Sequence, residues 1–313
     1  MQRFAGLVVL AGALAARAQE PSAIIGAQRI LFLGDSITWD GRYVAYVDAW
    51  LASRFPDQPR NVLNLGLPSE TVSGLSEADH AGGKFPRPVL RERLARVLEA
   101  TKPDLVIACY GINCAIYRPF DEERFKAFQD GMRDLHRAVL DSGAKIIHVT
   151  PPTFDKSRST GAPADYNDAV LGRYGEWLLA RRADGWEVID LHGPMTAAMN
   201  EGQRNDAAFT LQPDGIHPDD HGHWVMARTI IAHFGDADAA TAPTPEAMLS
   251  SCVAPRDALS KIGSRMTLLR DAWLTKTGHI RPEMPEGVPI DEAESAAKQL
   301  GTEIATALAP AKP

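Results

Sequence analysis

The chain has 313 residues, enough for one large α/β domain with an additional segment, or for two small domains. Its 45% hydrophobic and 23% charged content is ordinary for a globular protein. The formal net charge of −7 argues against nucleic acid or an anionic membrane surface as a partner. No stretch in the body of the chain is apolar for long enough to span a bilayer.

The N-terminal residues have the three zones of a secretory signal peptide in the right order. A short cationic start with Arg3 is followed by an almost wholly apolar segment, 4–15. Ala16 and Ala18 then occupy positions −3 and −1 of a cleavage site before Gln19. We therefore expect residues 1–18 to be a signal peptide and the mature protein to be secreted or periplasmic. An uncleaved N-terminal tail is the alternative.

From residue 28 to 235, short apolar runs alternate with longer amphipathic segments. The runs predict five strands, at residues 29–33, 61–65, 105–110, 145–150 and 186–190. Helical spacing predicts helices between or after them, at residues 43–55, 89–100, about 125–143, 166–182 and about 219–234. Continuous apolar strands separated by helices indicate an α/β fold, a three-layer αβα sandwich around a central parallel sheet. The carboxyl ends of such strands share one edge, where ligands bind.

After this domain, residues 19–235, the composition changes. Residues 236–245 are rich in Ala, Asp, Thr and Pro, and we expect a linker there. The rest, 246–313, is predicted to be a helical C-terminal extension with helices over 255–275 and 290–309.

The first of these helices carries an apolar stripe, which predicts that the extension docks on a surface. Its members are Ile262, Met266, Leu269 and Trp273. A proline-rich loop with His279 and Arg281 joins the two helices. We favour a purely structural helix-loop-helix over a lid that reaches the substrate.

Four short motifs lie at loops that follow strands or precede the last helix of the domain. In chain order they are Gly34-Asp35-Ser36-Ile37-Thr38, Asn64-Leu65-Gly66, Tyr110-Gly111-Ile112-Asn113 and Asp214-Gly215-Ile216-His217-Pro218. The first motif alone could equally be a turn with a helix N-cap. Together, however, all four can meet at the edge of the sheet where ligands bind.

Three residues in these motifs fit nucleophilic catalysis. The hydroxyl of Ser36 is a poor nucleophile until a base removes its proton. His217 is the candidate base, because neutral imidazole titrates near the working pH. Asp214, three residues earlier, can accept a hydrogen bond from the other ring nitrogen. The sequence therefore predicts a Ser36–His217–Asp214 triad.

With four motifs in this order, residues 28–235 resemble the SGNH hydrolases, the GDSL esterase/lipase family. The resemblance implies a flavodoxin-like SGNH fold and hydrolysis of a carboxylic ester through an acyl-enzyme at Ser36, with no cofactor. The N–H groups of Ser36 and Gly66 and the amide of Asn113 would form the oxyanion hole. One departure is Cys114, which stands where the family usually has an aspartate. It leaves the support of the Asn113 amide open, as well as a bridge between Cys109 and Cys114.

Export and open polar loops favour a short acyl ester, such as acetyl, on a small-molecule or polysaccharide carbohydrate. Asp35, Trp39 and Tyr43 adjoin Ser36 and are candidate substrate contacts. Tyr43 could equally face the core, and Trp39 could pack under the loop. The sequence predicts neither the acyl length nor the oligomeric state.

Three alternatives use the same residues differently. A lipase or thioesterase would keep the triad and change the substrate. A metal-dependent hydrolase would use the cluster Asp214, His217, Asp219, Asp220, His221 and His223. Ligands so closely spaced rarely face one centre, and we expect no metal. A carbohydrate-binding protein without activity is the third alternative, and the intact Ser36, Asn113 and His217 argue against it.

Overall fold

The computed structural model describes residues 23–159 and 161–311. The predicted signal peptide, residues 1–18, lies outside the described residues. Among the helices that are described, none combines the length and the apolar character needed to cross a membrane.

Five parallel strands form the central sheet, as predicted. They are β1 (Arg29–Gly34), β2 (Asn61–Asn64), β3 (Leu105–Cys109), β4 (Lys145–Val149) and β5 (Glu187–Ile189), in the order β2-β1-β3-β4-β5. Side chains on both faces of the inner strands are buried, which is why these segments are continuously apolar. The three-layer fold predicted from the sequence is confirmed.

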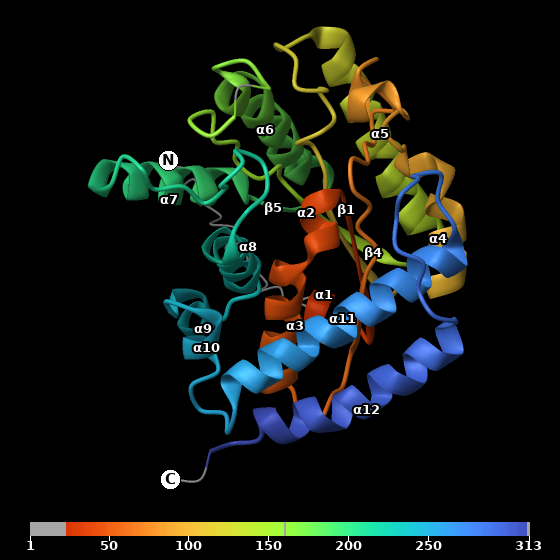
Figure 1. Ribbon diagram of the computed structural model, residues 1–313, viewed down its shortest axis with the longest axis vertical. Coiled ribbons are helices and arrows are strands. Elements are labelled where there is room, and N and C mark those ends of the chain that lie inside the picture. Colours follow the sequence, from red (N-terminus) through yellow and green to blue (C-terminus); the bar gives the residue numbers. More distant parts are fainter. Residues whose placement is uncertain (1–22, 160, 312–313) are drawn as a thin grey trace, which may run out of the picture.

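Helices cover both faces of the sheet (Figure 1). In chain order they are α1 (Ala23–Gly26), α2 (Ser36–Asp40), α3 (Arg42–Arg54), α4 (Leu94–Thr101), α5 (Glu122–Asp141), α6 (Arg173–Ala180), α7 (His192–Asn205) and α8 (Asp220–His233). Helices α3 and α8 pack against each other, with α7 beside α8. On the opposite side, α4 contacts α5, and Phe128 of α5 stacks on Tyr174 of α6 with ring centroids 4.3 Å apart.

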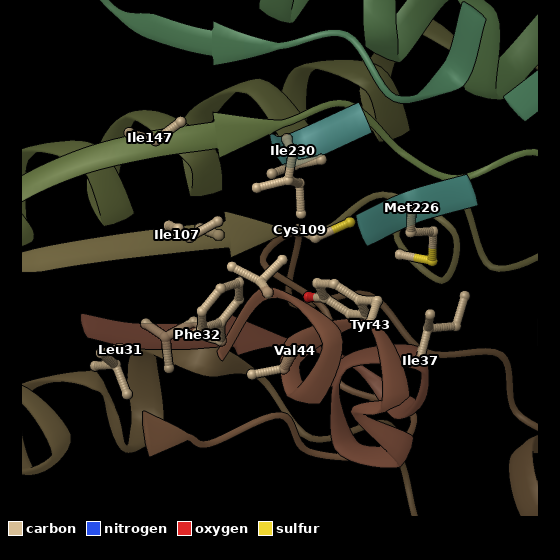
Figure 2. Packing of buried hydrophobic residues seen from close by; sticks show 14 of the residues in the cluster. Leu31, Phe32, Ile37, Tyr43, Val44, Ile107, Cys109, Ile147, Met226 and Ile230 are labelled. Carbon is tan, nitrogen blue, oxygen red and sulfur yellow. The ribbon is translucent and has the colours of Figure 1, made fainter. Parts of the chain in front are cut away.

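Aromatic and aliphatic side chains fill the space between the sheet and the α3–α8 pair (Figure 2). Phe32 of β1 meets Tyr43 of α3 edge to face, with ring centroids 5.9 Å apart. Met226 and Ile230 of α8 close the same cluster. Tyr43 is 1% exposed, so the first turn of α3 is anchored in the core beside the nucleophile motif.

The C-terminal region is helical, as predicted. It comprises α9 (Ala237–Thr241), α10 (Pro245–Met248), α11 (Pro255–Thr277) and α12 (Ile290–Leu308). Helix α11 packs on α3 and on β2, at one edge of the sheet, and α12 lies along α11 (Figure 1). The predicted apolar stripe of α11 is buried, from Ile262 to Trp273.

The predicted linker, 236–245, is folded against the domain. Asp236 accepts hydrogen bonds from Trp50 Nε1 at 2.9 Å and Arg54 Nε at 2.7 Å. Its other carboxylate oxygen caps α9 by accepting from the N–H of Ala239, whose side chain is buried. The composition of this segment predicted a linker. The alanine-rich residues instead form the capped helix α9, which packs on α8.

Candidate active site

Ser36 is the first residue of α2 and follows β1 directly. Gly34 permits this arrangement, because a Cβ atom there would lie 2.0 Å from Oγ1 of Thr38. The chain can therefore turn back sharply after the strand, which leaves Ser36 half-buried at the carboxyl edge of the sheet. This is the position that the sequence predicted.

The structure brings Ser36, His217 and Asp214 together. Ser36 Oγ lies 2.8 Å from His217 Nε2, and His217 Nδ1 lies 2.6 Å from Asp214 Oδ2. The second carboxylate oxygen of Asp214 accepts from the N–H groups of Ile216, at 2.9 Å, and His217, at 2.7 Å. This tight turn includes Gly215 at φ 85°, a left-handed conformation that favours glycine. The carboxylate thus fixes both the ring and the backbone of His217.

These hydrogen bonds define the direction of proton transfer. Partial burial acts to raise the pKa of Asp214, but the hydrogen bonds from the ring and backbone of His217 and from Ile216 hold it below its usual value. An ionised carboxylate only accepts, so Nδ1 of His217 carries the proton toward Asp214. The lone pair of Nε2 then faces the hydroxyl of Ser36, as a general base requires.

The three side chains lie at an open surface. The side chains of His217 and Asp214 are 47% and 56% exposed. A groove of about 1070 Å³ lies elsewhere, between α4 and α5, and its lining includes Leu94, Leu98 and Leu135 but none of the three. The triad is therefore reached from solvent without passing through that groove.

Asn113 is placed by β3 at the same edge as Ser36. Gly34 and Cys109 are register partners at the ends of β1 and β3, so the loops that follow these strands are neighbours. Asn113 is 3% exposed, and its Nδ2 donates to the backbone carbonyl of Glu70 over 3.4 Å. Within the described chain, no acceptor is recorded for the N–H of Ser36. Both groups can donate to a developing oxyanion.

Gly66 follows β2, and its oxyanion contact stays a prediction. Its N–H donates to Asn64 Oδ1 at 2.9 Å, so it already has an acceptor in this structure. A Cβ atom at this position would lie 2.3 Å from the backbone nitrogen of Trp39. Asn64 also donates through Nδ2 to the carbonyl of Thr38 at 2.5 Å. The glycine is needed for the close approach of this loop to α2.

Ser69, on the same loop, was not singled out from the sequence. It has φ 68°, which is uncommon for a residue with a side chain, and its N–H has no acceptor within the described part of the chain. The next residue, Glu70, contacts Asn113 through its carbonyl. A serine carries no signal for a left-handed backbone, so the sequence did not indicate this free donor.

The three predicted substrate contacts hold α2 in place. Asp35 is 3% exposed and caps α2, and burial raises its pKa to about 6. The buried hydroxyl of Tyr43 lies 3.0 Å from Thr38 Oγ1. Trp39 packs under the C-terminal extension, with the guanidinium of Arg270 4.2 Å from its ring centre. Tyr43 and Asp35 thus offer almost no surface to a substrate, since packing and capping use their side chains.

The residues of the alternative metal site have separate partners. Asp219 caps α8. Asp220 pairs with Arg42 at 2.7 Å, and His223 lies 3.1 Å from Asp40. No group of three or more potential ligands converges in residues 23–159 or 161–311.

The three cysteines are reduced, and their burial makes them poor nucleophiles. Cys109, Cys114 and Cys252 are free and buried. Burial raises the pKa of Cys114 to about 12, so its thiol stays protonated. It does not substitute chemically for the carboxylate that usually follows this asparagine.

A curated relative and two solved structures resemble this chain. An acetylxylan esterase from Geobacillus stearothermophilus is 27% identical over 230 residues, which cover 66% of this chain and 94% of that protein. A crystal structure of an acetylxylan esterase from the same organism matches with a TM-score of 0.51 at 22% identity, over the same shares of the two chains. A gut microbial diltiazem-metabolizing enzyme matches with a TM-score of 0.53 at 24% identity, over 66% of this chain and 47% of that one. The chain thus spans about half of that enzyme.

The solved structures of the esterase from Geobacillus stearothermophilus include three variants, in which a serine, an aspartate or a histidine is replaced by alanine. Each of them is described as a catalytic mutant. Its aspartate and histidine are three positions apart. In the present chain, the model of the GDSL-like lipase/acylhydrolase family matches residues 32–225, more than half of the sequence. The protein therefore belongs to the GDSL-like lipase/acylhydrolase family and is a carboxylic ester hydrolase.

Proposed function

We propose that this protein is an exported serine esterase that removes a short acyl group, foremost acetyl, from a carbohydrate. The observation that carries the proposal is the hydrogen-bonded series from Ser36 Oγ through His217 to Asp214, at 2.8 and 2.6 Å. The relative named as an acetylxylan esterase supports the substrate class.

Acyl transfer requires a nucleophile, a base with an orienting carboxylate and an oxyanion hole, and residues of this site can supply each of them. His217 Nε2 takes the proton as Ser36 Oγ attacks the ester carbonyl carbon, and Asp214 stabilises the imidazolium. The carbonyl oxygen becomes an anion that accepts from the N–H of Ser36, from Asn113 Nδ2 and, in this proposal, from the N–H of Ser69. Collapse breaks the ester C–O bond, and His217 protonates the departing alcohol. Water then attacks the acyl-enzyme with His217 again as base, which releases the acid and restores Ser36.

The exposure of the triad supports a small acyl group on a bulky alcohol. With side chains 47% and 56% exposed, His217 and Asp214 leave room for a polymer on the solvent side. A long acyl chain gains affinity only where an apolar channel buries it, and the apolar groove between α4 and α5 is not lined by the triad.

Export of the protein is part of the same proposal. Its support is the order of cationic, apolar and small residues in 1–18. The N-terminal sequence of protein recovered from a secreting host should begin at Gln19. An N-terminus at residue 1 or 2 would contradict export by this route.

The substrate is tested with p-nitrophenyl esters from acetate to palmitate, followed by acetylated xylooligosaccharides. We expect the highest kcat/KM on acetate, release of acetate from the oligosaccharides, no effect of a chelator, and no turnover by Ser36→Ala. Rates that rise toward palmitate would favour the lipase alternative, and a chelator-sensitive rate would favour the metal-dependent one. No turnover of any ester would favour a binding protein.

A further inference from the structure

The amide of Asn113 has an unexpected partner, the hydroxyl of Tyr117. We propose that Tyr117 is a positioning residue of the oxyanion hole, whose hydroxyl fixes the orientation of the Asn113 amide. The inference rests on the proposed function, since it assigns a positioning role to a residue of the same site. It also names what supports the amide in a chain where Cys114 replaces the aspartate usual in the family.

The contacts of Asn113 define which way its amide points. The carbonyl of Glu70 lies 3.4 Å from Nδ2, and the hydroxyl of Tyr117 lies 2.9 Å from Oδ1. A carbonyl can only accept, so the nitrogen must face Glu70 and the oxygen must face Tyr117. The phenol therefore donates. The second N–H of Nδ2 has no acceptor among the described residues and is available to the oxyanion.

The contact with Tyr117 is the stronger of the two. At 3.4 Å the hydrogen bond to Glu70 is at the long end of the range, whereas 2.9 Å is close to the optimum for a hydroxyl donor. The last torsion of an asparagine side chain is broad, so one long bond does not fix it. Without the phenol, the amide would sample orientations in which its N–H points away from the substrate.

Tyr117 is itself held by two contacts of its ring. Tyr166 stacks on it with ring centroids 5.4 Å apart and an interplanar angle of 23°. The guanidinium of Arg87 lies 5.3 Å from the ring centre, and two hydrogen bonds of 2.7 and 2.6 Å to Glu77 fix that guanidinium. Burial raises the pKa of Tyr117 well above its usual value, so the hydroxyl stays a donor at any working pH.

The backbone adopts an unfavourable conformation to bring this hydroxyl to Asn113. Ile116 and Tyr117 have φ values of 49° and 54°, in the left-handed region. A β-branched residue is rare there, and two such residues in succession are rarer. Strain of this kind persists where the surroundings determine it, and it concentrates at functional sites. The turn folds the ring back over the side chain four residues earlier.

The test removes one oxygen atom. Tyr117→Phe keeps the ring stack and deletes the donor, so kcat on p-nitrophenyl acetate should fall about 5- to 20-fold, while KM stays within about twofold. In an Asn113→Ala background the same change should have no further effect on kcat, because the amide it orients is gone. The matched control is Tyr174→Phe, which deletes the hydroxyl of a buried tyrosine that stacks on Phe125 and Phe128 of α5 and should leave kcat unchanged.

Three results would overturn the assignment. These are an unchanged kcat in Tyr117→Phe, a loss of kcat that adds in full to that of Asn113→Ala, and a Tyr117→Phe protein that fails to fold. The last result would assign the hydroxyl to stability. Failure of the proposed function is recognised separately, because turnover of the acetate ester would then persist in Ser36→Ala.

Discussion

Among single residues, Asn113 is the one that we propose binds charge present only in the transition state. Its side chain is buried, and one N–H of its amide is free to donate. Asn113→Ala should therefore lower kcat by about 10²- to 10³-fold with a small change in KM. Steady-state kinetics on p-nitrophenyl acetate measures both constants. If KM rises and kcat is retained, Asn113 is a substrate contact instead.

Burial of Asp35 in the folded protein disfavours the charged form of its carboxyl group. Its folded pKa of about 6 lies above the value of an unfolded aspartate, near 3.9. Between about pH 4 and 6 the unfolded chain loses a proton that the folded chain keeps, so stability falls as pH rises through this window. The loss is complete above pH 6.

Asp35→Asn removes the charge and keeps an acceptor for the N–H of Ile37. The free energy of unfolding at pH 8 should therefore increase by about 1–3 kcal/mol relative to the wild type. At pH 4 the two proteins should differ little. Urea unfolding at both pH values measures the free energy of unfolding, and the variant Asp57→Asn, at an exposed position, is the control. An equal gain at both pH values would show that desolvation of the charge is not the cause.

Residue types and their spacing predicted that Ser36, His217 and Asp214 would meet, because the histidine and its carboxylate lie on one short turn. They did not predict the contacts of the loops that follow β2 and β3. A glycine at position 66 allows close approach, and the group that approaches it is the backbone at Trp39. The N–H of Ser69 has no acceptor among the described residues, and the hydroxyl of Tyr117 donates to Asn113. These contacts depend on left-handed backbone conformations that the residue types do not encode.

Among the helices of the C-terminal region, α11 contacts the segments around the site. Met266 packs against the end of β2, with Sδ 3.5 Å from Asn64 Nδ2, and Arg270 donates to the carbonyl of Trp39 at 2.5 Å. Helix α11 thus supports both α2, which begins with Ser36, and the end of β2.

Met266→Ala should lower the free energy of unfolding by about 2–4 kcal/mol, because it leaves a cavity in a buried contact. Activity per folded molecule should persist below the melting temperature. The exposed neighbour Thr267→Ala is the control and should stay within about 0.5 kcal/mol of the wild type. Chemical denaturation and active-site titration measure the two quantities. Unchanged stability in Met266→Ala would mean that α11 is not anchored at this point.

Strands and long amphipathic helices were predictable because burial imposes a regular apolar pattern on them. Helix α7 was missed, since Gly193, Pro194 and Gly202 are typical of turns. The proline is tolerated because it lies in the first turn, where its missing N–H would have no partner. In residues 236–245, composition alone did not indicate a helix whose N-cap, Asp236, is held by Trp50 and Arg54 of α3.

At the scale of the whole molecule, the domain that matches the family model carries additional helices, which pack at the β2 edge of the sheet (Figure 1). The family model ends at residue 225, before the extension begins. The loop between α11 and α12 contacts the loop that follows β2, where Arg281 donates to the carbonyl of Pro68 at 3.0 Å, and its guanidinium lies over the ring of Phe85.

If this loop is structural, a His279→Ala/Arg281→Ala double variant should melt at a lower temperature than the wild type. The ratio of kcat/KM between an acetylated xylooligosaccharide and p-nitrophenyl acetate should not change, because the loop would make no distal substrate contact. A variant that melts normally and loses only the large substrate would identify the loop as a lid.

The most direct measurement is the location of the covalent adduct that a serine-directed organophosphonate forms, by peptide mass spectrometry alongside residual activity. We expect one adduct per molecule, on Ser36, with loss of ester hydrolysis in proportion to labelling and no labelling of Ser36→Ala. Labelling of His217→Ala should be slowed by orders of magnitude, since the base that activates the hydroxyl is absent. An adduct on another residue, or full ester hydrolysis by protein labelled at Ser36, would contradict this expectation.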